Sequence, residues 1–296
     1  MMELGTPVDA HCHFWDLQAM DYVWPTKEHP ALFHNFYPED LEEEMKESPF
    51  KNVIFVQVVN NTVDENYWAF DLAKKHKSIV GVVGWVDMTK PETVGDTINK
   101  LQENPLLVGF RHITELEDPD WLQRPDVNKS LSIIQDKGLT FDLLIRPPLT
   151  SRLVPKLARD FPQLKFIIDH IGKPNIKDGD IDKPDFNIHE WKEDMRNAAK
   201  YPNVYCKLSG LVTEADLNKW KPNDLKPFVQ YCVEHFGADR CLFGSDYPVY
   251  KMANATYSQV FCAVEECLEE CTDEEKSGIF GKNAVKFYNI RVPLNK

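Results

Sequence analysis

Residues 9–13 have the sequence DAHCH and lie in an apolar segment near the start of the chain. This segment predicts a β-strand, in which side chains alternate, so that His11 and His13 point the same way. Two imidazoles at this spacing can hold one metal ion or polarise one oxygen atom from one side. On its own, an HxH pair is more often two strand histidines with solvent or backbone partners. The rest of the chain reverses that preference.

Further apolar, β-branched segments follow at regular intervals, with helical patterns between most of them. Each is apolar throughout, as is typical of parallel strands that are covered on both faces. The predicted strands are residues 8–14, 52–59, 79–86, 108–113, 140–146, 165–171, 203–208 and 240–245. The predicted helices are residues 64–77, 91–103, 124–137, 151–160, 189–200 and 223–236, followed by 255–271 and 273–287.

Local signals support these helix boundaries. Asp64 and Ser151 are expected N-caps, Pro91 suits a first helical turn, and Gly138 and Gly237 stand where helices should end.

Eight strands alternating with helices in 296 residues predict an α/β fold, a single-domain (β/α)8 TIM barrel over residues 1–296. An open doubly wound sheet is the alternative, but its first strand would normally lead into a glycine-rich turn. Here His13-Phe14-Trp15 follows instead. The long irregular segments, residues 15–38 and 173–187, are expected to be binding loops or lids.

The composition limits the classes of molecule that the protein is expected to bind. The net charge of −13 argues against nucleic acid and anionic membranes, which both reward clustered lysine and arginine. The longest apolar runs are far shorter than the ~20 residues of a membrane span. Seven cysteines without framework spacing are expected to be free thiols, which favours a cytoplasmic protein. The expected partner is a small-molecule substrate. The oligomeric state stays open.

Polar residues collect where the predicted strands end, and this is the edge that carries the active site of an α/β barrel. They are His11 and His13, then Arg111 and His112, Arg146, residues 169–173 (DHIGK), Lys207 and Ser209, and finally residues 244–248 (GSDYP).

Four of these residues form a coherent catalytic set, namely His11, His13, His170 and Asp246. Three imidazoles and a carboxylate can hold one divalent ion such as Zn²⁺ and leave a position for water. Without metal, the same residues can polarise a carbonyl while Asp246 takes a proton from water. Asp169 is expected to orient a histidine from behind.

The neighbouring cations and aromatic rings are candidate substrate contacts. Cations around the site suit a substrate with carboxylate or hydroxyl groups, and aromatic rings suit a sugar face. The candidates are Arg111, His112, Arg146, Lys173, Lys207, Trp15, Trp24, Trp85 and Tyr247. For three of them an alternative remains: His112 as a core histidine, Lys207 in a buried ion pair, and Arg146 as a solvated cation.

With these residues in hand, the chain resembles the amidohydrolase superfamily, in its branch of sugar-acid and dicarboxylate lactonases. The resemblance covers nearly the whole chain and rests on five blocks in order. They are residues 9–15 (DAHCHFW), 109–112 (GFRH), 169–174 (DHIGKP), 206–210 (CKLSG) and 243–248 (FGSDYP), with Asn283-Ala284 and Phe287-Tyr288 near the end.

The resemblance implies that His11, His13, His170 and Asp246 are the catalytic core, with Arg111 and Lys173 as substrate contacts. It also implies either one divalent ion or metal-free catalysis. A binuclear centre needs a bridging Lys or Glu on the fourth strand and a His after the fifth, where this chain has Arg111-His112 and Arg146. Members of this branch hydrolyse lactones such as those of L-fuconate and L-rhamnonate.

Three functions follow as hypotheses. The first is a hydrolase that opens a sugar-acid lactone, with Asp246 activating water. The second is a metal-dependent decarboxylase of aromatic acids, since such enzymes share the HxH pair and the terminal Asp; the HIGKP block points away from them. The third is a non-catalytic binding protein, which the complete His/His/His/Asp set disfavours.

Overall fold

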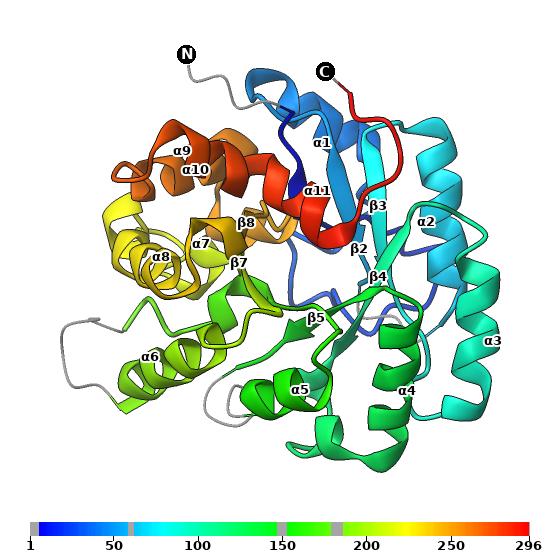
Figure 1. Cartoon of the computed structure of the whole chain (residues 1–296). Helices are drawn as coiled ribbons and strands as arrows, with labels where there is room; N and C mark the ends of the chain where they lie inside the picture. The colour runs from blue at the N-terminus through cyan, green and yellow to red at the C-terminus, as the bar shows by residue number, and fades with distance from the viewer. Residues whose placement is uncertain (1–5, 59–61, 147–152, 179–185, 296) are drawn as a thin grey trace.

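The computed structural model describes residues 6–58, 62–146, 153–178 and 186–295. Its centre is a sheet of eight parallel strands, paired in chain order and surrounded by helices (Figure 1). The strands are β1 (Asp9–Cys12), β2 (Val53–Val56), β3 (Ile79–Gly84), β4 (Leu107–Ile113), β5 (Thr140–Leu144), β6 (Phe166–Ile168), β7 (Val204–Leu208) and β8 (Cys241–Phe243).

The first strand meets the chain just beyond the last strand, so the sheet closes on itself. Cys12 forms a parallel bridge with Tyr247. The His13 amide donates to the Tyr247 carbonyl at 2.7 Å, and the Asp246 amide donates to the His11 carbonyl at 2.9 Å. The predicted (β/α)8 barrel is confirmed, with every predicted strand present.

The helices follow the predicted alternation. Their bounds are α1 (Pro38–Glu44), α2 (Asp64–Lys75), α3 (Pro91–Leu101), α4 (Pro125–Asp136), α5 (Val154–Asp160), α6 (Phe186–Ala199), α7 (Leu211–Glu214), α8 (Pro222–Phe236), α9 (Tyr257–Cys267), α10 (Asp273–Ser277) and α11 (Asn283–Tyr288). The short helices α1 and α7 were not predicted. The predicted helix 273–287 is divided by a π-helical turn, Gly278–Lys282.

The helix-end signals were mostly correct. Pro91 occupies the first turn of α3, and Gly138 and Gly237 follow α4 and α8 with φ of 67° and 80°. The N-cap of α2 is Val63 rather than Asp64, which lies one position inside the helix as an acidic first-turn residue. Ser151 lies outside the described residues.

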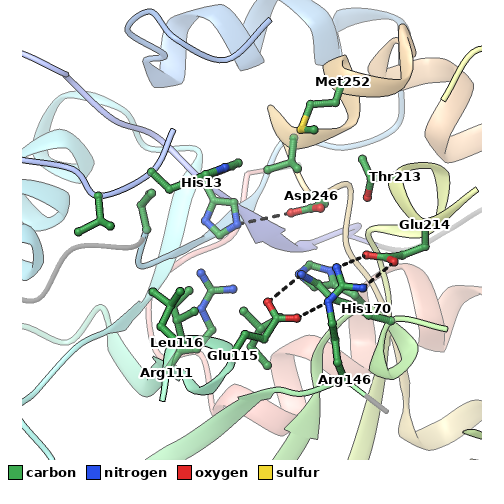
Figure 2. A pocket seen from close by; sticks show the side chains of 17 residues that line it. His13, Arg111, Glu115, Leu116, Arg146, His170, Thr213, Glu214, Asp246 and Met252 are labelled. Carbon is green, nitrogen blue, oxygen red and sulfur yellow. Dashed lines mark hydrogen bonds and ion pairs between the residues drawn. The ribbon is translucent and has the colours of Figure 1, made fainter. Parts of the chain in front are cut away.

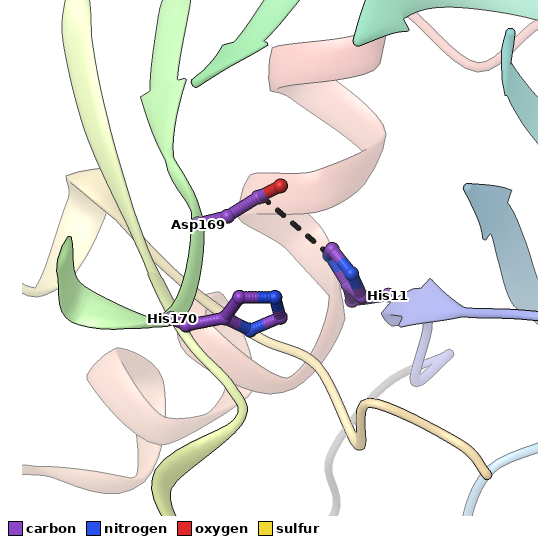
Figure 3. A group of neighbouring side chains, drawn as sticks. All are labelled: His11, Asp169 and His170. Atoms are coloured by element: carbon purple, nitrogen blue, oxygen red, sulfur yellow. Dashed lines mark ion pairs between the residues drawn. The ribbon is translucent and has the colours of Figure 1, made fainter. Parts of the chain in front are cut away.

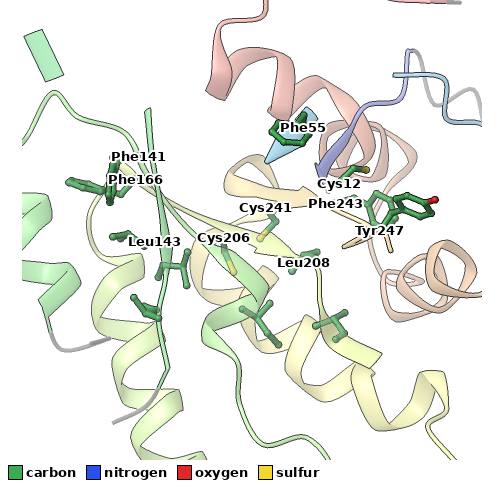
Figure 4. Close-up of a cluster of buried hydrophobic side chains, with 14 of the residues drawn as sticks. Cys12, Phe55, Phe141, Leu143, Phe166, Cys206, Leu208, Cys241, Phe243 and Tyr247 are labelled. Carbon is green, nitrogen blue, oxygen red and sulfur yellow. The ribbon is translucent and has the colours of Figure 1, made fainter. Parts of the chain in front are cut away.

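Alternation along the strands divides the apolar side chains between two layers. On β2, Val53 and Phe55 join the outer cluster that packs under the helices, part of which Figure 4 shows, whereas Ile54 and Val56 join an inner cluster. The inner cluster also contains Phe287 and Tyr288 of α11. The last helix therefore forms an apolar floor for the barrel, below the polar residues of the site.

No described helix has the length and apolarity needed to cross a bilayer.

Candidate active site

The HxH pair lies where the alternation of inward and outward side chains along β1 is interrupted. Val8 and Ala10 belong to the inner cluster, whereas Cys12 and Phe14 belong to the outer one, and the pairing of β1 with β2 shifts register between Asp9 and Cys12. This shift places both His11 and His13 on the inner face, where alternation continued from Val8 and Ala10 would have placed them outside. Their Nε2 atoms lie 3.2 Å apart, so the prediction that both histidines point the same way is confirmed.

The partners of the two imidazoles constrain which ring nitrogen carries the proton. His13 Nδ1 lies 2.8 Å from the Val56 carbonyl, which can only accept, so His13 carries its proton on Nδ1 and has a free lone pair on Nε2. His11 lies between two cations that can only donate: its Nδ1 is 3.0 Å from Lys207 Nζ, and its Nε2 is 3.3 Å from Arg111 Nη1. Either nitrogen can accept from its cation while the proton on the other faces an acceptor, Asp169 Oδ1 at 3.5 Å from Nδ1 or His13 Nε2 at 3.2 Å from Nε2.

Burial also keeps these histidines uncharged. It lowers the pKa of His11 well below the usual value, and the neighbouring Lys207 cation acts in the same direction. Burial lowers the pKa of His13 as well, although its interaction with Asp246 opposes the shift. Neutral imidazoles at neutral pH leave lone pairs available for a proton or a metal ion.

Lys207 is fully buried beneath His11, and three side chains lie within hydrogen-bonding distance of its ammonium group. Besides His11, these are Asp142 at 2.5 Å and Asp169 at 3.0 Å. The Tyr288 hydroxyl, on the α11 floor, donates to Asp142 at 2.7 Å. One buried polar network therefore joins α11, β5, β7 and His11.

Asp246 brings a carboxylate to the other side of His13. Its backbone is left-handed, with φ of 61°, and its Oδ1 lies 3.4 Å from His13 Nε2 and 3.8 Å from His11 Nε2. Because the His13 proton is on Nδ1, Nε2 cannot donate to this oxygen. Oδ1 is buried and has no hydrogen-bond partner among the described residues. Two acceptors, His13 Nε2 and the unpaired Asp246 Oδ1, thus face one another.

His170 reaches the site through an unusual turn after β6. His170, Ile171, Gly172 and Lys173 all have positive φ, between 48° and 71°. The His170 ring lies 4.6 Å from that of His11, on the side of Asp169, as Figure 3 shows. Its Nδ1 is 3.0 Å from the Ser209 hydroxyl, and burial lowers its pKa well below the usual value.

These residues border a pocket of about 470 Å³ at the carboxyl end of the barrel (Figure 2). Of the predicted catalytic residues, His13, His170 and Asp246 line it, and His11 lies directly behind them. Of the predicted substrate contacts, four line it: Arg111, Arg146, Lys173 and Trp24. Arg111 is held by bonds from its guanidinium to the carbonyl and side-chain oxygens of Gln57.

The other predicted contacts lie outside the pocket wall. His112 follows Arg111 on β4 and so faces the helices, where it stacks on Trp121 at 4.0 Å and bonds to Trp85 and Glu117. Lys207 occupies the buried ion pair already described. Trp15 and Tyr247 are fully buried, and Trp15 supports Trp24 from behind with ring centroids 5.7 Å apart.

Comparison with known proteins agrees with this geometry. The family model described as Amidohydrolase matches residues 8–290. The chain belongs to the amidohydrolase family. Two relatives, L-fucono-1,5-lactonases of Burkholderia ambifaria and Burkholderia multivorans, are 33% and 30% identical to this amidohydrolase. The alignments cover 97% of this chain in both cases and 96% and 97% of the relatives.

Solved structures show the same architecture. An amidohydrolase from Burkholderia multivorans with bound zinc is 28% identical, covers 97% of this chain and 100% of its own, and has a TM-score of 0.86. A 5-carboxyvanillate decarboxylase from Novosphingobium aromaticivorans, with a TM-score of 0.69, is 13% identical and is similar in fold alone.

Two clusters in the described part of this amidohydrolase have the composition of a metal site. One is His11, His13 and Asp246, and the other is His11, Asp169 and His170; each places its ligand atoms within 4.8 Å of one another. His11 is common to both. The four predicted ligands therefore lie together, but His170 is grouped with Asp169 rather than with His13 and Asp246.

Sequence reasoning missed the acidic residues of the pocket wall. Glu115 follows β4 in a 3-10 turn, and Glu214 ends α7, the short helix after β7. Both lie a few residues beyond the strand ends, where their spacing alone does not distinguish them from solvated loop acids. Asp142 was missed too, although a charge inside the apolar β5 was a visible signal.

Glu65, near the start of α2, predicts a pH dependence of stability. It is buried, its Oε1 accepts from the Val58 amide at 3.0 Å, and its Oε2 has no hydrogen-bond partner in the described ranges. Burial raises its pKa from 4.5 to about 8. Between these values the folded protein holds a proton that the unfolded chain has lost, so Glu65 stabilises the fold fully below pH 4.5 and progressively less up to pH 8.

Glu65→Gln removes this titration. The stability of the variant relative to wild type should therefore increase with pH, by up to roughly 1.4 kcal/mol per pH unit, and level off above the folded pKa. Urea unfolding of both proteins at several pH values between 5 and 9 measures the difference. A difference that does not change with pH would contradict the assignment.

Proposed function

We propose that this amidohydrolase hydrolyses the lactone ring of a small sugar acid. The observation that carries the proposal is the unpaired Oδ1 of Asp246, which faces His13 Nε2 at 3.4 Å beside the pocket. A water molecule on the pocket side of these two buried acceptors can give one hydrogen bond to each. The full-length similarity to L-fucono-1,5-lactonases supports the choice of a sugar lactone as substrate.

In the proposed reaction, the water oxygen attacks the lactone carbonyl carbon while Asp246 takes a proton from the water. When the ring C–O bond breaks, Asp246 returns the proton to the leaving alkoxide oxygen. Arg111, fixed by Gln57, stabilises the negative charge that develops on the carbonyl oxygen. His170, whose Nδ1 faces Ser209, keeps Nε2 for a bond to the substrate.

The residues also fit one divalent ion. His13 Nε2 and Asp246 Oδ1 offer lone pairs, and so does His11 Nε2 when the His11 proton is on Nδ1, which lies 3.5 Å from Asp169. We assign His11, His13 and Asp246 as the residues that would hold the ion. A divalent ion bound there would supply a Lewis acid for the lactone carbonyl.

Gly210 should be essential to the placement of His170. Its φ is 62°, and a Cβ at this position would lie 2.6 Å from His170 Nδ1. Gly210→Ala is therefore expected to displace the imidazole and to lower kcat/KM by roughly 10–100-fold. Gly138→Ala is the matched control, because Gly138 has φ of 67° and a Cβ added to it would meet no atom within 4 Å. Equal activity of the two variants would contradict the role.

A panel of lactones tests the proposed function directly. Purified protein is mixed with L-fucono-1,5-lactone, L-rhamnono-γ-lactone and other aldonolactones, and acid release is followed with a pH indicator. Hydrolysis without CO2 supports the proposal; CO2 release from aromatic acids with no lactone hydrolysis would replace it with a decarboxylase. Turnover before and after treatment with a chelator, together with metal analysis, determines whether an ion is required.

A further inference from the structure

One wall of the pocket is a network of ion pairs, which we call the acidic clamp: Glu115, Arg146, Lys173 and Glu214. Arg146 Nε donates to Glu115 at 2.5 Å, and its two terminal nitrogens donate to the two oxygens of Glu214 at 3.1 and 3.2 Å. Lys173 donates to the other oxygen of Glu115 at 3.2 Å. Figure 2 shows Arg146 between Glu115 and Glu214.

The topology of the barrel assembles this clamp. Its residues follow β4, β5, β6 and β7, four neighbouring strands whose carboxyl ends share one edge. Thr114 binds the Leu144 carbonyl and ties the turn that carries Glu115 to the end of β5. The Lys177 amide donates to the Glu214 carbonyl at 3.0 Å and ties the loop after β6 to α7. The clamp is thus fixed by backbone as well as by side chains.

The two glutamates of the clamp lower the net charge of the pocket wall that a substrate would contact. Among the described lining residues, the three cations Arg111, Arg146 and Lys173 are balanced by the three carboxylates Glu115, Glu214 and Asp246. The side chains of Glu115, Lys173 and Glu214 are only 23%, 18% and 13% exposed, so their charges are less screened than those of surface pairs.

We propose that Glu115 and Glu214 determine specificity, by selecting lactones with uncharged hydroxyl substituents against lactones that carry a further carboxylate. A carboxylate on the substrate could pair with Arg146 or Lys173 only by displacing Glu115 or Glu214, which the fold holds next to these cations. It would also be repelled by the negative charge of the two glutamates. Hydroxyl groups can donate to the glutamates and accept from the cations. This inference rests on the proposed lactone hydrolysis.

The test uses two substrates that differ in one group, an aldono-1,4-lactone and the aldaro-1,4-lactone of the same sugar, in which the terminal CH2OH is a carboxylate. Wild type should prefer the aldonolactone. In Glu115→Gln/Glu214→Gln, kcat/KM for the aldarolactone divided by kcat/KM for the aldonolactone should rise at least about tenfold. The change should come mainly from a lower KM for the aldarolactone. A factor of ten corresponds to only about 1.4 kcal/mol of interaction free energy.

Glu103→Gln/Glu193→Gln is the matched control, because both residues are exposed and the net charge changes equally. Its ratio should change by less than about twofold, since exposed charges beyond a screening length contribute little. An unchanged ratio in a folded clamp variant that still hydrolyses the aldonolactone would overturn the inference. If the double variant does not fold, the same ratio measured for Glu115→Gln alone tests the inference. Glu115 is chosen because its side chain is more exposed than that of Glu214, so its replacement should disturb the fold less.

Failure of the proposed function has a different signature. If wild type hydrolyses no lactone of the panel, lactone hydrolysis is rejected. Calorimetric measurement of the affinities for the aldarate and the aldonate then tests the charge selectivity without turnover. A selective gain in aldarate affinity in the clamp variant would uphold it, and parallel changes for both ligands would reject it.

Discussion

Replacing Asp246 with asparagine should lower kcat for lactone hydrolysis by about 10²–10⁴-fold, the range that a positioned general base contributes. The asparagine amide has nearly the same shape as the carboxylate but cannot take a proton from water. Asn also tolerates the left-handed backbone that Asp246 adopts, at φ of 61°. The bond from its backbone amide to the His11 carbonyl is unaffected, so the barrel should close as before.

Three measurements make this result specific to Asp246. Steady-state kinetics give kcat and KM, thermal unfolding checks the fold, and metal analysis of both proteins separates loss of a base from loss of an ion. Asp136→Asn, an exposed residue at the end of α4, is the control and should behave as wild type. Turnover retained by Asp246→Asn would remove Asp246 from the role of base.

Lys207→Met should have the largest effect on stability, a loss of about 3–5 kcal/mol, as is usual when one partner of a buried ion pair is removed. Lys207 is fully buried, and its ammonium bonds to Asp142, Asp169 and His11. Asp169 would retain the Arg111 guanidinium, 3.4 Å away. Asp142 would retain the Tyr288 hydroxyl but no cation among these contacts.

This asymmetry predicts a rescue. Lys207→Met/Asp142→Asn should recover much of the lost stability, because the second change removes the carboxylate whose charge was left uncompensated. Lys74→Met is the control, since Lys74 pairs with Asp71 on the exposed face of α2 and should contribute less than about 1 kcal/mol. Urea unfolding at neutral pH measures all three variants. A double variant less stable than Lys207→Met would show that Asp142 is not the source of the penalty.

Local patterns predicted the barrel well because each βα unit carries its own signals. The strands are apolar on both faces, and residues such as Pro91, Gly138 and Gly237 mark helix ends through their own backbone preferences. The short helices α1 and α7 escaped prediction because segments of four to seven residues show no helical period. The π-helical turn between α10 and α11 has no such signal either.

The order of residues was enough to predict that polar side chains gather at one end of eight strands, since parallel strands bring their carboxyl ends to the same edge. On this basis the sequence predicted that His11, His13, His170 and Asp246 lie close together. Which of their neighbours face the pocket depends instead on the folded barrel. Lys207 of β7 is paired with Asp142 of β5, and Arg146 after β5 is held by Glu115 after β4 and by Glu214 after β7. Two of these three contacts join β5 to β7, which are not consecutive in the chain. An ion pair depends on the distance between its two charged groups, and that distance exists only once the barrel has closed.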